Sequence, residues 1–248
     1  MEPDLSYPRM NFYRRSDFTP DDERLLADYD REILALLGTD FAFPVRMRDW
    51  ELRRVLEATA RLSPGARILD TGSFNTYLGL HLSRTPAHQV TVSDLLRARA
   101  VKSVLRRLGL APAKPTEVGY FTWARTMRKH GLTVSEIDLT KINLPDASFD
   151  CIISLSVIEH IPAIEQALAE MYRVLAPGGR LLITTDCSRE PVPFSAGVRY
   201  FSEAELERLF APYPVTSPRN HPDFSPENWC YGGKVPVVTS FVEITKPR

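Results

Sequence analysis

The hydrophobic pattern of residues 19–62 predicts two amphipathic helices. Between Thr19 and Gly38, apolar residues recur at helical spacing, and the stretch opens with Pro20 and three acidic residues, which favour a helix N-terminus. A second pattern of this kind runs from about Trp50 to Leu62 and ends at a Ser-Pro-Gly breaker. We expect residues 1–50 to form a helical cap over a main domain of residues 51–248; alternatively, the helices only cover one sheet edge.

From Arg67 onward, short apolar runs alternate with helical patterns, which is typical of βα units and a parallel sheet. The helical stretches between and after the strands are NTYLGLHLSR, RAVKSVLRRLG, AIEQALAEMYRVLA and YFSEAELERLFA. Seven strands are expected, in the order ARILDTG, HQVTVSD, LTVSEID, FDCIISLS, GGRLLITTD, PVTS and VPVVTSFVEIT. The pattern therefore predicts an α/β fold with a doubly wound, Rossmann-like sheet.

Composition supports a folded chain and disfavours some partners. Of the 248 residues, 44% are hydrophobic and 25% are charged, as in globular proteins. Lysine plus arginine and aspartate plus glutamate are both 31, so no net positive charge favours nucleic acid or an anionic membrane. The chain has no apolar run of membrane-spanning length and no signal-peptide pattern. Three cysteines without a CxxC pair predict no metal site, and we expect a cytoplasmic protein.

The first strand carries the first candidate chemistry. Asp70 and Gly72 lie at its end, where the next helix begins, and doubly wound folds bind ligands at this edge. Asp94 ends the next strand, at a spacing that suits a carboxylate accepting hydrogen bonds from a ribose diol. An aspartate at a strand end is also common as a turn or helix cap. A dinucleotide loop would need glycines where Phe74 and Tyr77 stand, so we expect a nucleoside without phosphates.

Later segments resemble the class I S-adenosylmethionine-dependent methyltransferases, particularly the group that includes the quinone-biosynthesis methyltransferases. The resemblance covers roughly residues 52–245. It is carried by the runs IDLTKINLPDASFDCIISLSVIEHI and EMYRVLAPGGRLLIT, and most specifically by Leu144–Asp150, Ser154–Ile161 and Arg173–Ile183. It implies a seven-stranded sheet with an antiparallel last strand, and S-adenosyl-L-methionine as the cofactor, released as S-adenosyl-L-homocysteine.

The resemblance also implies roles for individual residues in holding the cofactor. Asp70 would lie near the methionine amino group, in a loop formed with Gly72, Ser73 and Asn75. Asp94 would hold the ribose hydroxyls, and Leu95 would border the adenine. The adenine would also meet Asp138 and Leu139, and the methionine end would be lined by Ser154 and Leu155.

The loop departs from the family's usual D-x-G-x-G-x-G pattern. Phe74 and Thr76 stand where the second and third glycines would be, so their side chains reshape the loop. Asn75 tolerates left-handed backbone angles and can supply the turn. Phe74 is either a core or lid residue or a cofactor contact.

Two histidines are candidate general bases, which methyl transfer to a hydroxyl would require. His160 follows the fourth strand; alternatively, Glu159 and His160 only start the next helix and hold the loop. His221 lies in an insertion near 218–235, whose length and aromatic content suggest a substrate wall or lid, with packing as the alternative. The candidate wall residues are Phe224, Trp229, Tyr231, Gly232 and Gly233.

A second insertion, near 97–130, is basic. From Arg97 to Lys129 it holds nine bases and one acid, Glu117. It forms either a pocket edge for a substrate phosphate or carboxylate, or a solvated helix face.

The leading hypothesis is a methyltransferase that acts on a small molecule, with O-methylation of a natural-product or saccharide-type acceptor favoured. We expect no nucleic-acid or membrane partner, and a homodimer is possible. The alternatives are a nucleic-acid methyltransferase, which the basic insertion would serve, and an inactive methyltransferase-like binding protein, which the missing loop glycines would favour.

Overall fold

The computed structural model divides the chain into two compact units. Unit 1 comprises residues 1–20 and 139–248, and unit 2 comprises residues 21–138. The structure describes residues 10–37, 48–74, 76–84, 88–95, 101, 104–106, 108–110, 120–195, 197–230 and 235–248. None of the described helices has the length and apolar run that a bilayer crossing needs.

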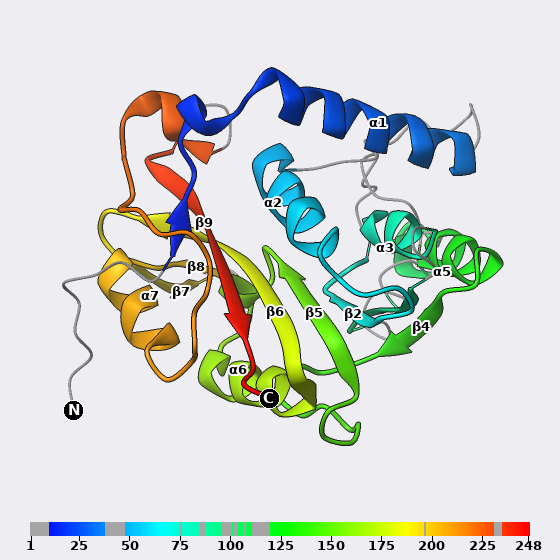
Figure 1. Ribbon diagram of the computed structural model, residues 1–248. Coiled ribbons are helices and arrows are strands. Elements are labelled where there is room, and N and C mark those ends of the chain that lie inside the picture. The colour runs from blue at the N-terminus through cyan, green and yellow to red at the C-terminus, as the bar shows by residue number, and fades with distance from the viewer. Residues whose placement is uncertain are drawn as a thin grey trace. The chain divides into compact units, whose positions relative to one another are not determined.

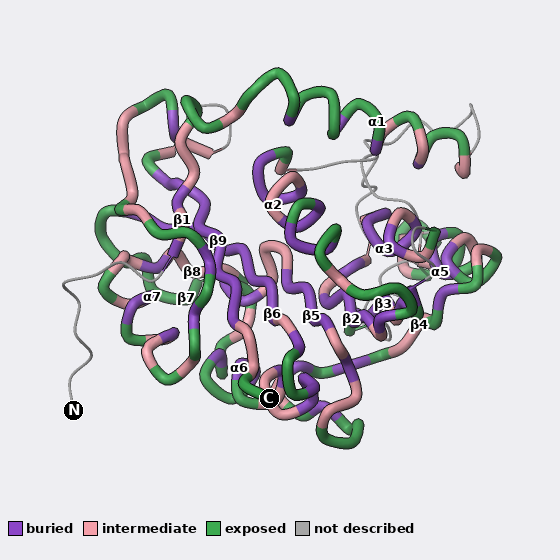
Figure 2. The backbone as a smooth tube through the Cα atoms, in the orientation of Figure 1, coloured by how far each residue is buried: buried purple, intermediate pink, exposed green. Residues whose placement is uncertain are grey.

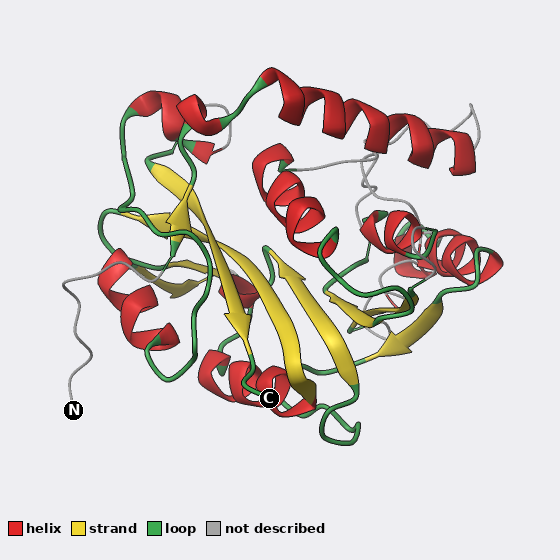
Figure 3. Ribbon diagram, in the orientation of Figure 1, coloured by secondary structure: helices red, strands yellow, loops and turns green. Residues whose placement is uncertain are grey.

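Unit 2 is built from parallel strands and helices that alternate along the chain (Figures 1 and 3). Its strands pair in the order β2-β3-β4, and both pairings are parallel. The register sets Asp70 opposite Val92 and Asp94 opposite Glu136, so the strands end at the same edge. The elements are α1 (Pro20–Leu37), α2 (Asp49–Thr59), β2 (Arg67–Thr71), α3 (Leu78–Leu82), β3 (Gln89–Asp94), α5 (Tyr120–Lys129) and β4 (Thr133–Glu136).

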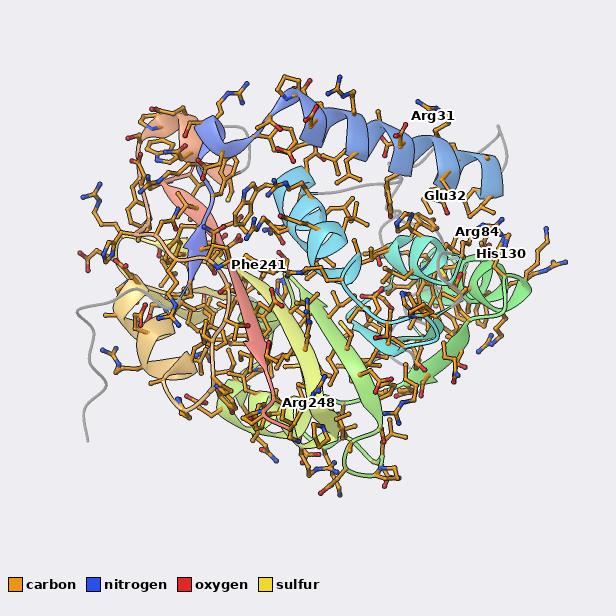
Figure 4. The ribbon with its side chains drawn as sticks, viewed as in Figure 1. Arg31, Glu32, Arg84, His130, Phe241 and Arg248 are labelled. Carbon is orange, nitrogen blue, oxygen red and sulfur yellow. The ribbon has the colours of Figure 1, made fainter. Side chains whose placement is uncertain are left out.

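Helix α1 is attached to the rest of unit 2 by one apolar face and by ion pairs. Leu26 and Ile33 are buried on that face, while the opposite side is exposed (Figure 2). Arg53 of α2 pairs with Asp22 at 2.5 Å. The Nδ1 atom of His81 in α3 lies 2.8 Å from Glu32, on the side of α1 that faces Arg84 (Figure 4).

Unit 1 contains a mixed set of strands in the order β1-β9-β6-β5. β5 and β6 are parallel, whereas β9 runs antiparallel to both β6 and β1. These strands are largely buried (Figure 2). The elements are β1 (Asn11–Phe12), η1 (Arg15–Asp17), β5 (Phe149–Leu155), η2 (Ile158–His160), α6 (Ile164–Val174), β6 (Leu175–Ser188), β7 (Val192–Ser195), β8 (Val198–Tyr200), α7 (Glu203–Phe210), η3 (Pro226–Asn228) and β9 (Val237–Thr245).

The entry into β6 and the start of α7 follow local rules. Gly178 has a φ of +77°, and a Cβ on Gly179 would lie 2.8 Å from the carbonyl oxygen of Ala176, so the turn requires both glycines. Ser202 caps α7 by accepting from the Glu205 backbone N–H, while the Glu205 carboxylate accepts from the Ser202 backbone N–H.

Asparagine side chains in residues 218–228 hold β1 and the η1 turn that follows it. The Asn220 side-chain oxygen accepts from the Phe12 N–H at 2.5 Å, and its amide nitrogen donates to the Phe12 carbonyl at 3.0 Å. Asn228 accepts from the Arg15 N–H at 2.8 Å. We call residues 218–228 the strap, because they fix an edge strand of only two residues.

The predicted alternation of strands and helices is present, and the last strand is antiparallel. Seven strands belong to the α/β fold, β1, β9, β6 and β5 in unit 1 and β2, β3 and β4 in unit 2. The sixth predicted strand, PVTS, was wrong: Val215 forms only an isolated bridge to Ile244, and β1 supplies the seventh strand. The β7-β8 pair was not predicted. The compact units divide near residues 20 and 138, and the cap of residues 1–50 stays a prediction.

Candidate functional site

The carboxyl ends of β2 and β3 bring several of the predicted cofactor residues together in unit 2. Ser73 follows β2 and donates both its backbone N–H, at 2.9 Å, and its hydroxyl, at 3.2 Å, to the carbonyl oxygen of Ser93. Gly72 has a φ of +60°, a conformation that glycine adopts without steric cost. The chain therefore turns sharply between Asp70 and Ser73, next to the end of β3.

Asp70 is a buried carboxylate that needs a counter-charge. Its side chain is 2% exposed, and Oδ2 has no hydrogen-bond partner among the described residues. Burial raises the pKa of Asp70 to about 7. The aromatic residues Tyr29 and Tyr77 are also buried nearby, where burial, and then the charge of Asp70, raise the pKa of Tyr29. An orphaned carboxylate in an apolar, aromatic setting fits an ammonium group such as the amino end of S-adenosylmethionine.

Helix α5 holds the side chain of Phe74 and the backbone of Thr76, the two residues that replace the loop glycines. The ring of Phe74 meets the edge of Trp123 at a centroid distance of 5.6 Å. The indole N–H of Trp123 donates to the Thr76 carbonyl at 3.2 Å, and the Thr76 hydroxyl donates to Ser73 at 2.9 Å. Phe74 thus packs within unit 2. Asn75 lies outside the described residues.

Sequence reasoning missed Trp123 as a support of this loop. The sequence showed residues 97–130 only as a basic insertion, and the contact between Trp123 and Thr76 spans 47 positions. Of the described bases there, Arg125, Arg128 and Lys129 are exposed, as on a solvated helix face.

Asp94 and Leu95 lie where the ribose and adenine contacts were predicted. Asp94 is 7% exposed at the end of β3, and its Oδ1 accepts from the Leu95 N–H at 2.6 Å. Leu95 is 52% exposed. Asp138 is exposed, two residues beyond β4, and the N–H of its neighbour Ile137 donates to the Asp94 carbonyl at 3.4 Å. The edge of unit 2 therefore presents two aspartates and an exposed apolar side chain.

In unit 1, the predicted residues Ser154 and Leu155 end β5. Ser154 is fully buried, and its hydroxyl has no partner among the described residues. Ser156 has a φ of +52°, rare for a residue with a side chain, and its N–H donates to both the hydroxyl and the carbonyl of Thr184. Such backbone strain clusters at functional sites. Leu139 is buried at the start of this unit's second segment.

His160 is exposed and anchored through one ring nitrogen. Its Nδ1 lies 2.6 Å from the carbonyl oxygen of Gly197, in the β7-β8 turn. Because a carbonyl only accepts, Nδ1 carries the proton, and in the neutral ring Nε2 is then the acceptor. Glu159 is buried and accepts from the Thr185 hydroxyl at 3.0 Å. This arrangement suits either a general base or the loop-holding alternative.

His221 forms a close pair with an acid that sequence reasoning did not single out. Its Nδ1 lies 2.6 Å from Oε1 of Glu203, the first residue of α7. The candidate wall residues Phe224 and Trp229 bond to each other, since the indole N–H donates to the Phe224 carbonyl at 2.8 Å. Tyr231, Gly232 and Gly233 lie outside the described residues.

Comparison with known proteins decides the family. The family model described as "Methyltransferase domain" matches residues 117–183, which include the segments that carry the resemblance. Over these residues the chain matches a domain of the class I S-adenosylmethionine-dependent methyltransferase type. The predicted recognition, enzyme class and cofactor are therefore confirmed.

Relatives of the methyltransferase act on different acceptors, to judge by their names. It is 25% identical over 158 residues to the phosphatidylethanolamine N-methyltransferase of Cereibacter sphaeroides, covering 63% of this chain and 67% of the relative. It is 31% identical over 149 residues to the demethylmenaquinone methyltransferase of Thermus thermophilus, covering 60% of this chain and 58% of the relative. These matches span about two thirds or less of the relatives' length.

A solved structure shares the fold of the methyltransferase. The 1,6-didemethyltoxoflavin-N1-methyltransferase of Burkholderia thailandensis, solved with S-adenosylhomocysteine, matches with a TM-score of 0.54 and 18% identity over 100% of both chains. The likeness confirms the predicted Rossmann-like α/β fold.

Proposed function

We propose that the methyltransferase moves the methyl group of S-adenosylmethionine to an oxygen of a small natural-product or saccharide-type acceptor. Transfer to oxygen is supported by the contacts of two histidine side chains. Nδ1 of His160 is bonded to a carbonyl, and Nδ1 of His221 lies beside a carboxylate. In the neutral ring each leaves Nε2 able to accept the proton of a hydroxyl nucleophile.

The residues at the edge of unit 2 would hold the cofactor. Asp70 would bind the methionine ammonium, Asp94 the ribose hydroxyls, and Leu95 and Asp138 the adenine. When bound, the cofactor supplies an electrophilic methyl on a sulfonium. The chain's own task is then to align the acceptor, exclude water and remove one proton. Ser73 fixes the loop geometry by its bonds to Ser93.

The proposal also covers the location and the partners of the enzyme. We infer a cytoplasmic enzyme with a small-molecule acceptor, no nucleic-acid partner, and a homodimer as one possible assembly. The balanced charge of the sequence supports the absence of a nucleic-acid partner.

One observation favours a second candidate, an inactive binding protein of the same fold. Phe74 and Thr76 place side chains where the family usually has glycines, and α5 holds them there. Such a protein would bind no cofactor.

The test is transfer of isotopically labelled methyl from S-adenosylmethionine to a panel of hydroxylated small molecules. We expect transfer to oxygen, and a loss of about 10²–10⁴-fold in kcat for either His160→Gln or His221→Gln, whichever residue is the base. His130→Gln serves as the control. Transfer only to nitrogen or carbon, or full activity in both variants, would overturn the oxygen assignment.

A further inference from the structure

A further pocket lies within unit 1, beside the β7-β8 turn that holds His160. It has a volume of about 520 Å³, within the range of small-molecule sites. Its walls are the first turns of α6, the β7-β8 pair and α7, which lie beside one another (Figure 1). Neither the proposed base nor any proposed cofactor residue lines it.

The wall formed by β7 leaves apolar side chains uncovered. Val192 is 44% exposed and Phe194 is 37% exposed, although both line the pocket. The opposite side carries Leu168, Leu209 and Tyr213. Burial raises the pKa of Tyr213, so its hydroxyl stays a donor at neutral pH. An apolar, ring-bearing molecule would cover surface that now faces water.

Two arginines and two glutamates line the pocket, and Arg208 is the one that is available to an anion. Arg208 is exposed in the last turn of α7 and makes no ion pair or hydrogen bond with any described residue. Glu205 is engaged in the cap of α7, where its carboxylate accepts from Ser202. α6 begins at the pocket without a side-chain cap, so its first N–H groups also present positive potential. Glu165 lies exposed at the rim.

A second arginine shapes the wall. The guanidinium of Arg199 lies 5.6 Å from the ring centroids of both Phe194 and Phe201, and it donates to the Pro162 carbonyl at 3.1 Å. This contact ties β8 to the segment before α6. Arg199 thus fixes the aromatic wall, while Arg208 is left to meet a ligand.

We propose that this pocket binds a small aromatic carboxylate, with its ring against Phe194 and Tyr213 and its carboxylate on Arg208. No residue assigned to the cofactor or to proton removal lines this pocket, and the proposal holds whether or not the acceptor atom is oxygen. The ring covers the exposed β7 side chains, and the arginine supplies a charged donor for the carboxylate.

Calorimetry with 2-naphthoate and its neutral analogue 2-naphthamide tests the proposal. We expect saturable binding of 2-naphthoate to the full chain, at least 10-fold tighter than that of 2-naphthamide. Arg208→Glu is expected to weaken the binding of 2-naphthoate at least 10-fold and to leave the affinity for 2-naphthamide unchanged. Leu209→Trp, which fills the pocket, is expected to weaken the binding of both probes.

The matched control is Arg128→Glu, since Arg128 is also an exposed arginine in the last turn of a helix, α5. It changes the net charge equally and is expected to have no effect. Equal affinities for the two probes, equal effects of the two arginine variants, or no saturable binding would overturn the proposal. Binding of S-adenosylhomocysteine, measured in the same samples, reports separately on the cofactor site.

Discussion

Asp70 is the residue whose environment is most unusual for its type. A buried carboxylate without a donor on Oδ2 costs free energy that a bound cation offsets. Burial raises its pKa to about 7, so near neutral pH a bound cation decides whether the group is ionised. The same residue therefore destabilises the ionised apoprotein and favours a cofactor that carries an ammonium.

This predicts a pH dependence of cofactor affinity. The ammonium pairs only with the ionised carboxylate, so below pH 7 binding must release a proton from Asp70. We expect the dissociation constant of S-adenosylhomocysteine to fall about 10-fold per pH unit between pH 5 and 7 and to level off above. Calorimetry across this range measures it.

Asp70→Asn is the matched variant, because it keeps the shape and removes the titration. We expect this variant to bind S-adenosylhomocysteine more weakly than the wild type at pH 8. Its dissociation constant should not change with pH below pH 7. A wild-type affinity that is flat from pH 5 to 8 would rule against a cofactor contact at Asp70.

At the scale of elements, the loop after β2 depends on α5. Replacing Trp123 by Phe keeps the ring contact with Phe74 but leaves the Thr76 carbonyl without its donor. We expect a loss of about 1 kcal/mol in the free energy of unfolding, measured by urea denaturation. The same variant should also bind S-adenosylhomocysteine more weakly, because the loop after β2 loses its hydrogen bond to α5.

Phe121→Leu, at an exposed position of the same helix, is the control and should change neither quantity. An unchanged cofactor affinity in Trp123→Phe, together with the stability loss, would mean that α5 supports the fold but not the cofactor loop.

The strap makes a second element-scale prediction. Asn220→Leu removes both side-chain bonds to Phe12, and its cost is expected to be about 1–3 kcal/mol in the free energy of unfolding. Backbone hydrogen exchange should rise first at Phe12 and Tyr13, since β1 has only two residues to pair. Exchange that stays slow at both amides would show that the strap is not what holds β1.

The elements that sequence patterns predicted are those with long, regular periodicity. Such patterns occur in α1, α6, α7, β5, β6 and β9. β1 is too short to show a period, and β7 is exposed along its whole length. Pairings such as Asn220 with Phe12 join residues 208 positions apart, so no local pattern could reveal them.

The candidate site could likewise be predicted only in part from the sequence. The positions of Asp70, Gly72 and Asp94 at the strand ends could be predicted from the pattern, and their roles in holding the cofactor stay predictions. The partners that define their chemistry could not be predicted, since the burial of Asp70 and the contact of Trp123 with the loop depend on distant segments. Glu203 carried no signal as a partner of His221, because its position at the start of α7 already explained an acidic residue.

At the scale of the whole molecule, the account makes this chain a methyltransferase that uses S-adenosylmethionine. The matched domain supports this cofactor, and the carboxylates at the ends of β2 and β3 are the residues proposed to hold it. The names of its relatives range from a phospholipid amine to a quinone precursor, whereas the acceptor proposed here is a hydroxylated small molecule.

The measurement that tests the central claim most directly is calorimetric binding of S-adenosylhomocysteine to the full chain and to Asp94→Ala, with Asp28→Ala as an exposed control. We predict a micromolar dissociation constant that Asp94→Ala weakens about 10-fold or more, equivalent to about 1.4 kcal/mol, and that the control leaves unchanged. No binding by the wild type would contradict the account, because it would mean that Phe74 and Thr76 close the loop to the cofactor.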